Sequence, residues 1–262
     1  EWHTMAEAIG IYGNGYQPYG ERAEYRDSVQ TKGLGVVGGH YTNPKGLKVD
    51  AWDYLIENIM NTALLQAVWK GPKWYGGVQY LRQDPLQSEV GEDSSSVYYW
   101  PNECTNMFGV RVGRKFGPVK VDLNYGRVTK SGRFIFPREV GREQFFISLS
   151  RSRIEGAGDV HAATMRLRYE SPKIPGLKLK SGVGYFYFPG HGEEFYLNKY
   201  GEPCYAQIDF DAKYAFQKAL KGLEFEFLYV FRESPREFLD HPDFVFNRSN
   251  FHHLNFITNI TF

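Results

Sequence analysis

The amino-acid sequence predicts an all-β fold, namely an antiparallel up-and-down transmembrane β-barrel or a large C-terminal part of one. Three observations point to it. Aromatic residues make up 17% of the 262-residue chain, yet the mean hydropathy is only -0.47. Apolar and polar residues alternate with a period of two in most segments. Short turns alternate with long loops, as in barrels whose periplasmic turns are tight and whose external loops are long.

The composition excludes several other classes of protein. A net charge of +1 argues against a nucleic-acid binder, which usually carries a marked basic excess. No run approaches the ~20 apolar residues of a membrane helix. No signal peptide is visible, so we expect a mature chain or an excised piece. Cys104 and Cys204 lack metal-ligand spacing and leave open whether they pair, and we expect neither a cofactor nor a metal site.

Eleven strands are expected along the chain. Residues 1–31, rich in Gly, Tyr and charge, have no sustained period and are expected to form a long external loop. The strands follow at about 33–42, 46–55, 60–70, 73–83, 106–116, 119–128, 160–170, 177–188, 205–216, 223–232 and 251–262. Trp69, Trp74 and Tyr80 suit interfacial positions, where an amphipathic ring sits at head-group depth.

Alternation alone does not say what the apolar side of each strand touches. In 119–128, for example, Val121 and Leu123 oppose Asp122 and Asn124. In a soluble β-sandwich the apolar side is the core and the charged side is the surface. In a barrel the apolar side meets lipid and the charged side meets water in the bore.

The segment 129–158 decides the strand count. If Phe145–Ser150 within it were a spanning strand, the earlier short turns would move to the external side and the long loops to the periplasmic side. We therefore expect 129–158 to be one loop and the join near 56–60 to be a short external turn, which gives 11 spanning strands. The rival count is 12, with Phe145–Ser150 included. Single-chain bacterial barrels normally have even numbers, so eleven favours part of a larger barrel.

The last strand has a further feature. Phe256, Ile260 and the terminal Phe262 lie on one side of a period of two. Bacterial outer-membrane barrels commonly end in this way, because the closing strand is read by the barrel-assembly machinery. These three residues are the predicted assembly signal.

The whole chain resembles the OprD-like porins of Gram-negative outer membranes. The likeness is carried, in order, by GLKVDAWDYLIENIMNTALLQA, FPREVGREQFF, SPKIPGL, LNKYGEPCYAQIDFDAKY, LKGLEFEFLYVFRE and the terminal Phe262. These porins are 18-stranded barrels that pass small solutes, often with a carboxylate group. The resemblance implies that 1–262 is a single domain holding about 11 of 18 strands. It also implies that 129–158 folds inward as a constriction loop.

The resemblance further implies a ladder of basic residues down one wall of the bore, since fixed cations favour anionic groups. The strand positions that match in character are Arg111, Lys120, Arg166, Arg168, Lys178 and Lys180. The constriction loop would add Arg133, Arg138, Arg142, Arg151 and Arg153. An acidic wall opposite them would comprise Asp209, Asp211, Glu224 and Glu226.

The function expected from this pattern is a passive diffusion channel in the outer membrane, with lipid and small solutes as partners and with either a monomer or a homotrimer possible. The first alternative is a soluble ligand-binding β-sandwich or barrel. The second is a barrel enzyme, which needs a nucleophile beside a base. His252 and His253 are adjacent, but no G-x-S-x-G motif accompanies them, so we expect no catalysis.

Overall fold

The computed structural model describes residues 2–3, 33–86, 99–136, 145–190, 197–198, 201–234 and 250–261, and shows a single antiparallel sheet. Among these residues, no helix is long and apolar enough to cross a membrane. The strands are β1 (Trp2–His3), β2 (Leu34–Thr42), β3 (Leu47–Ile56), β4 (Met60–Lys70), β5 (Trp74–Pro85), β6 (Thr105–Phe116), β7 (Val119–Val128), β8 (Val160–Glu170), β9 (Leu177–Tyr187), β10 (Tyr205–Ala215), β11 (Leu223–Glu233) and β12 (Phe251–Ile260).

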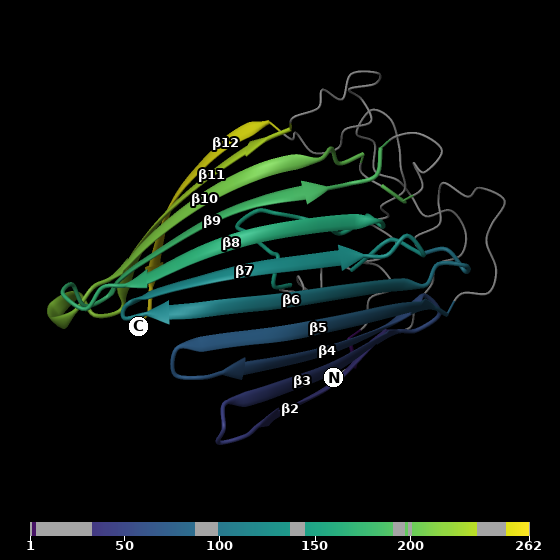
Figure 1. Cartoon of the computed structure of the whole chain (residues 1–262), viewed down its shortest axis with the longest axis horizontal. Coiled ribbons are helices and arrows are strands. Elements are labelled where there is room, and N and C mark those ends of the chain that lie inside the picture. The colour runs from purple at the N-terminus through teal and green to yellow at the C-terminus, as the bar shows by residue number, and fades with distance from the viewer. Residues whose placement is uncertain are drawn as a thin grey trace.

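Each strand pairs with its neighbours in sequence, in the order β1 to β12. Figure 1 shows the hairpin turns gathered at one end of this curved sheet and the long connections at the other. The predicted eleven long strands are confirmed, and β1 adds a two-residue pairing with β2 at Gly35 and Leu34. The rest of the predicted loop 1–31 lies outside the described residues.

The backbone settles two points on which the strand count depends. Phe145–Ser150 forms turns rather than a strand, so the rival count of 12 spanning strands is wrong. The join between β3 and β4 is a three-residue turn at the loop end, as expected. Ile59 N–H donates to Ile56 O at 3.0 Å, and Asn58 has φ 63°, a left-handed conformation that asparagine tolerates well.

The sheet is open within the described residues. β12 pairs with β11 alone, and β2 pairs with β1 and β3. All eleven long strands run 9 to 12 residues, from β2 at 9 to β5 and β6 at 12. A transmembrane strand tilted by ~45° needs about 9–11 residues, so these lengths match one bilayer crossing.

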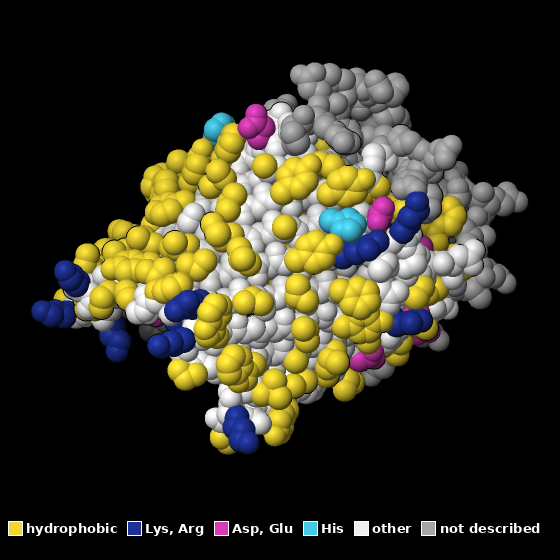
Figure 2. All heavy atoms as spheres, in the orientation of Figure 1, with side chains coloured by type: hydrophobic (Ala, Val, Ile, Leu, Met, Phe, Trp, Pro, Cys, Tyr) yellow, Lys and Arg dark blue, Asp and Glu magenta, His cyan; other side chains and the backbone are white. Residues whose placement is uncertain are grey.

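One face of the sheet, which we name the outer face, exposes its apolar side chains. Val37 is 74% exposed, Leu123 60% and Phe256 78%. Figure 2 shows hydrophobic side chains spread over the strands, with charged ones mainly towards the two ends. The β-sandwich alternative is therefore wrong: there is one sheet, and these apolar side chains do not meet in a common core.

Candidate functional site

The opposite face, the inner face, is the one against which residues 145–158 pack. We name residues 145–158 the inner segment. Close approach to the sheet is possible because glycines occupy inner-face positions beneath it. A Cβ on Gly126 would lie 2.9 Å from Ile147, and one on Gly182 would lie 2.6 Å from Leu149. Larger residues at these two positions would push the inner segment off the sheet.

A buried carboxylate organises the middle of the inner face. The Asp122 side chain on β7 is 0% exposed. Arg166 Nε donates to Asp122 Oδ1 at 3.2 Å, and Arg168 Nη2 donates to Oδ2 at 2.5 Å. Arg111 Nε lies 3.6 Å from Oδ1. The neutral donors are Tyr75 Oη at 3.0 Å and Asn124 Nδ2 at 2.8 Å. Three guanidinium groups surround one carboxylate, so this Asp122 cluster has an excess of two positive charges.

The same arginines hold the inner segment in place. Arg111 Nη2 donates to Phe146 O at 3.2 Å, and Arg166 Nη1 donates to Ser148 O at 3.2 Å. Gln79 Oε1 accepts from Phe146 N at 2.7 Å. Two of the predicted basic wall residues therefore use part of their hydrogen-bonding capacity on backbone carbonyls. Arg168 makes no such contact and, with a side chain 35% exposed, is the most open of the three.

The inner segment is also held at its far side, on β10 and β11. Ser150 N donates to Asp209 Oδ2 at 2.7 Å, and Gln207 Nε2 donates to Ser150 O at 2.7 Å. Arg232 Nη2 donates to Arg151 O at 2.7 Å. The side chains that anchor this segment thus extend from β5 to β11, across most of the sheet.

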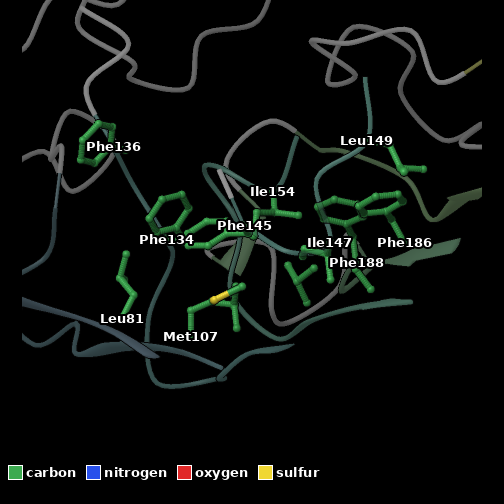
Figure 3. Close-up of a cluster of buried hydrophobic side chains, with 14 of the residues drawn as sticks. Leu81, Met107, Phe134, Phe136, Phe145, Ile147, Leu149, Ile154, Phe186 and Phe188 are labelled. Atoms are coloured by element: carbon green, nitrogen blue, oxygen red, sulfur yellow. The ribbon is translucent and has the colours of Figure 1, made fainter. Parts of the chain in front are cut away.

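Apolar packing fills the loop end of the inner face. Figure 3 shows Phe134, Phe145, Ile147 and Ile154 from the loop between β7 and β8 beside Leu81, Met107, Phe186 and Phe188, all of them buried. The Phe134 and Phe145 rings meet edge to face with centroids 5.0 Å apart. The inner face therefore carries this apolar cluster near the long loops and mainly polar side chains further towards the turns.

The predicted arginines of the loop have different surroundings. Arg133 is buried and its Nε donates to Glu103 Oε1 at 2.6 Å, which ties two long loops together. Arg151 is exposed, with φ 63°. Arg153 is half-buried, and its N–H donates to Tyr205 Oη at 3.4 Å. Arg138 and Arg142 lie outside the described residues.

Arg232 is an anchoring residue that the sequence did not single out. Its side chain is 4% exposed, and Nη1 lies 2.8 Å from Glu202 Oε1. The guanidinium also stacks 3.9 Å from the centroid of the Tyr205 ring. A single arginine at a strand end gives no sign in the sequence that it will be buried, because its partners are contributed by another strand and two loops.

Towards the short turns the inner face carries ion pairs between neighbouring strands. Lys180 Nζ lies 3.0 Å from Asp211 Oδ2, and Lys120 Nζ lies 3.1 Å from Glu170 Oε1. Lys213 bridges the other two carboxylates, at 3.1 Å from Glu224 Oε1 and 2.8 Å from Glu226 Oε2. Lys178 is exposed on the same face of β9.

All four acidic residues predicted for the opposite wall have partners among the described residues. Asp209 binds the inner segment, while Asp211, Glu224 and Glu226 each pair with a lysine of the neighbouring strand. Three of the predicted acidic residues therefore lie beside lysines of β9 and β10, and the acidic wall opposite the basic residues stays a prediction. The excess of positive charge is concentrated at the Asp122 cluster.

The two cysteines do not pair, and the predicted residues of the closing strand that the structure describes lie on the outer face. Cys104 and Cys204 are both free thiols. Burial raises the pKa of Cys104, and the Asp84 carboxylate, which accepts from Cys104 Sγ at 3.5 Å, adds to this effect. On the outer face of β12, Phe256 and Ile260 are exposed. Phe262 lies outside the described residues.

By its architecture the chain is an up-and-down β-barrel sheet whose apolar face points outward and whose polar face holds a long loop. Solved porin structures have this fold. The chain resembles OccD1 (OprD) with a TM-score of 0.66 at 15% identity over 88% of this chain. It resembles OccAB4 of Acinetobacter baumannii with a TM-score of 0.64 at 16% identity over 88%. It resembles OprD of Pseudomonas aeruginosa with a TM-score of 0.63 at 14% identity over 90% of this chain.

The likeness to these three structures covers only part of each. The chain spans 59% of the OccD1 chain, 53% of OccAB4 and 61% of OprD. No protein-family model and no curated protein matches the sequence. The comparisons therefore show that the chain shares the fold of the OprD-like porins.

Proposed function

We propose that this chain forms part of a porin in the outer membrane of a Gram-negative bacterium, through which small hydrophilic solutes diffuse passively. The outer face supports this placement. Its exposed Val, Leu and Phe side chains would be costly in water and are favourable against hydrocarbon. The strand lengths fit one bilayer crossing. Lipid is then the partner of the outer face, and Phe256, Ile260 and Phe262 are the proposed contacts for the assembly machinery.

We further propose that the inner face favours anionic or carboxylate-bearing solutes. The observation that carries this is the Asp122 cluster, where Arg111, Arg166 and Arg168 outnumber their carboxylate by two charges. Lys120, Lys178 and Lys180 extend the basic residues towards the turns. Fixed cations along a pore wall attract anions and repel cations. Of the three arginines, Arg168 is proposed to contact solute most directly, because its side chain is the most exposed.

The inner segment is the proposed constriction. It lies on the inner face and is anchored from β5 to β11, so it narrows the space inside any barrel that this sheet forms part of. With the short turns periplasmic, the apolar packing of Phe134 and Phe145 faces the external side. A solute would pass the inner segment before reaching the lysines nearer the turns.

Ion selectivity tests this proposal. The protein is inserted in planar bilayers with a KCl gradient, and the reversal potential gives the ratio of chloride to potassium permeability. We expect anion preference in the unmodified protein and a smaller preference in Arg168→Gln. Arg127→Gln is the matched control, because Arg127 lies on the outer face of β7 and should leave selectivity unchanged. A cation-selective pore, or none at all, would overturn the proposal.

A further inference from the structure

The two ends of the sheet differ strongly in charge. The short-turn rim comprises the hairpin turns with their flanking strand ends, residues 43–48, 70–74, 114–120, 168–180 and 213–224. It carries 14 of the 31 Lys and Arg residues but only two of the 30 Asp and Glu residues, in a chain whose net charge is +1. Figure 2 shows basic side chains projecting at this end, beyond the hydrophobic surface.

Aromatic residues accompany the cations on the outer face of the rim. Trp69, Trp74 and Phe116 are each about half exposed there, at the ends of β4, β5 and β6. Tryptophan at the boundary between hydrocarbon and water is typical of membrane-embedded proteins, with Lys and Arg extending from the same level to the head groups. In the membrane placement proposed above, the rim would lie at the level of the lipid head groups of one leaflet.

Arg114 is the best-defined cation of this rim. It lies on the outer face of β6, in the same alternating series as Val110 and Val112, and it is exposed. Its guanidinium carbon is 5.0 Å from the centroid of the Trp74 ring and 4.8 Å from that of Phe116. Among the described residues it forms no ion pair. By contrast, the next residue, Lys115, points inward and donates to Gly71 O at 2.9 Å.

We propose that Arg114, held between Trp74 and Phe116, binds the phosphate of an acidic phospholipid in the leaflet that surrounds the short turns, with Lys73 of the adjacent turn as its neighbour. A stacked guanidinium keeps its N–H edge available for a phosphate, which it binds in a bidentate manner. The position favours lipid over a nucleic acid or a protein partner, because the cation is on the apolar face that meets hydrocarbon. This inference rests on the membrane placement proposed above.

The affinity for single lipids tests the proposal. The purified protein in a zwitterionic detergent is titrated with phosphatidylglycerol and, separately, with phosphatidylethanolamine, and native mass spectrometry counts the bound lipids. A basic residue near an anionic surface contributes enough for about a fivefold change in affinity. We expect Arg114→Gln to weaken phosphatidylglycerol binding about fivefold and to leave phosphatidylethanolamine binding unchanged. Arg114→Lys, which keeps the charge but loses the stacked, bidentate geometry, should restore only part of the loss.

The controls separate this site from general charge effects. Arg127→Gln removes an outer-face arginine at the opposite end of the sheet and should bind phosphatidylglycerol as the unmodified protein does. If Arg114→Gln does not fold, as judged by heat-modifiable migration on gels, Trp74→Leu replaces it and should also weaken binding. Equal loss in Arg114→Gln and Arg127→Gln, or no loss in Arg114→Gln, would overturn the proposal.

Two further measurements distinguish phospholipid from lipopolysaccharide as the source of the phosphate, and loss of the lipid site from loss of the membrane placement. Stronger binding of lipopolysaccharide than of phosphatidylglycerol, lost in Arg114→Gln, would place the rim in the other leaflet and overturn the assignment. Conductance is measured in parallel in bilayers of purely zwitterionic lipid. If the protein conducts but binds phosphatidylglycerol no more tightly than phosphatidylethanolamine, only the lipid site at Arg114 is contradicted. If the protein forms no pore, the membrane placement is contradicted as well.

Discussion

Replacing Asp122 by asparagine is the perturbation that bears most directly on the inner face. The Asp122 carboxylate is fully buried and accepts hydrogen bonds from Arg166, Arg168, Tyr75 and Asn124. In Asp122→Asn the shape is kept, but three guanidinium groups face an amide that has no charge. Removing one partner of a buried ion pair costs about 3–5 kcal/mol. Because Arg168 is 35% exposed and partly solvated, we expect the lower end, about 3 kcal/mol.

The free energy of unfolding is measured by urea titration of the protein in lipid vesicles, followed by tryptophan fluorescence. Glu170→Gln is the control, since Glu170 forms the same kind of contact with Lys120 but is 59% exposed. An exposed pair contributes about 0–1 kcal/mol, so this variant should remain close to the unmodified protein. The same Asp122→Asn protein should also show increased anion preference, because the excess charge at the cluster rises by one.

The two readouts make the prediction specific. A loss of less than about 1 kcal/mol in Asp122→Asn would put it in the range of an exposed pair and contradict the burial of the cluster. Loss of stability with unchanged or reduced anion preference would show that the Asp122 cluster does not face the permeation path.

Three further variants test the inner segment and the loops. A Cβ at position 126 would lie 2.9 Å from Ile147, so Gly126→Leu should displace the inner segment and increase single-channel conductance. Unchanged conductance would count against a constriction there. Arg232→Gln removes the contacts with Glu202 and the carbonyl of Arg151, so we expect a loss of about 3 kcal/mol in unfolding titrations and noisier open-channel currents, whereas quiet currents would contradict an anchoring role. In the Cys204→Ser protein Cys104 is the one remaining thiol, and its raised pKa should make its alkylation at pH 8 slower than that of a free cysteine. The rate should rise with pH at a higher pH than for the free thiol. Equal rates for Cys104 and a free cysteine would contradict the burial of Cys104.

The strands could be predicted from the sequence because two local signals agree. Period-two alternation identifies each strand, and the Pro- and Gly-containing turns mark where each strand begins and ends. The expected strands at 60–70 and 119–128 match β4 and β7 residue for residue. The strand count could be predicted because successive connections of an up-and-down sheet lie at alternate ends, with the short turns at one end and the long loops at the other.

The partners of the charged residues could not be predicted in the same way. Alternation places Arg111, Asp122 and Arg168 on one face, but it does not show that one carboxylate collects three guanidinium groups from three strands. Arg133 was predicted as a residue of the constriction loop, but nothing in the sequence indicated its pairing with Glu103, 30 residues away in another loop. One signal was present in the sequence: the apolar runs at 134–136 and 145–147, within a loop, indicate burial against the sheet.

Site-directed spin labelling of the two faces tests the central claim most directly. Leu167 points outward from β8, and Lys180 points inward from β9; Leu167 pairs with Ser181, the residue next to Lys180, so the two labels would lie close together on opposite faces. In lipid vesicles the label at position 167 should respond to oxygen and that at position 180 to a water-soluble nickel complex. Equal access of the nickel complex to both, or its exclusion from both, would contradict an outer face in hydrocarbon and a wet inner face.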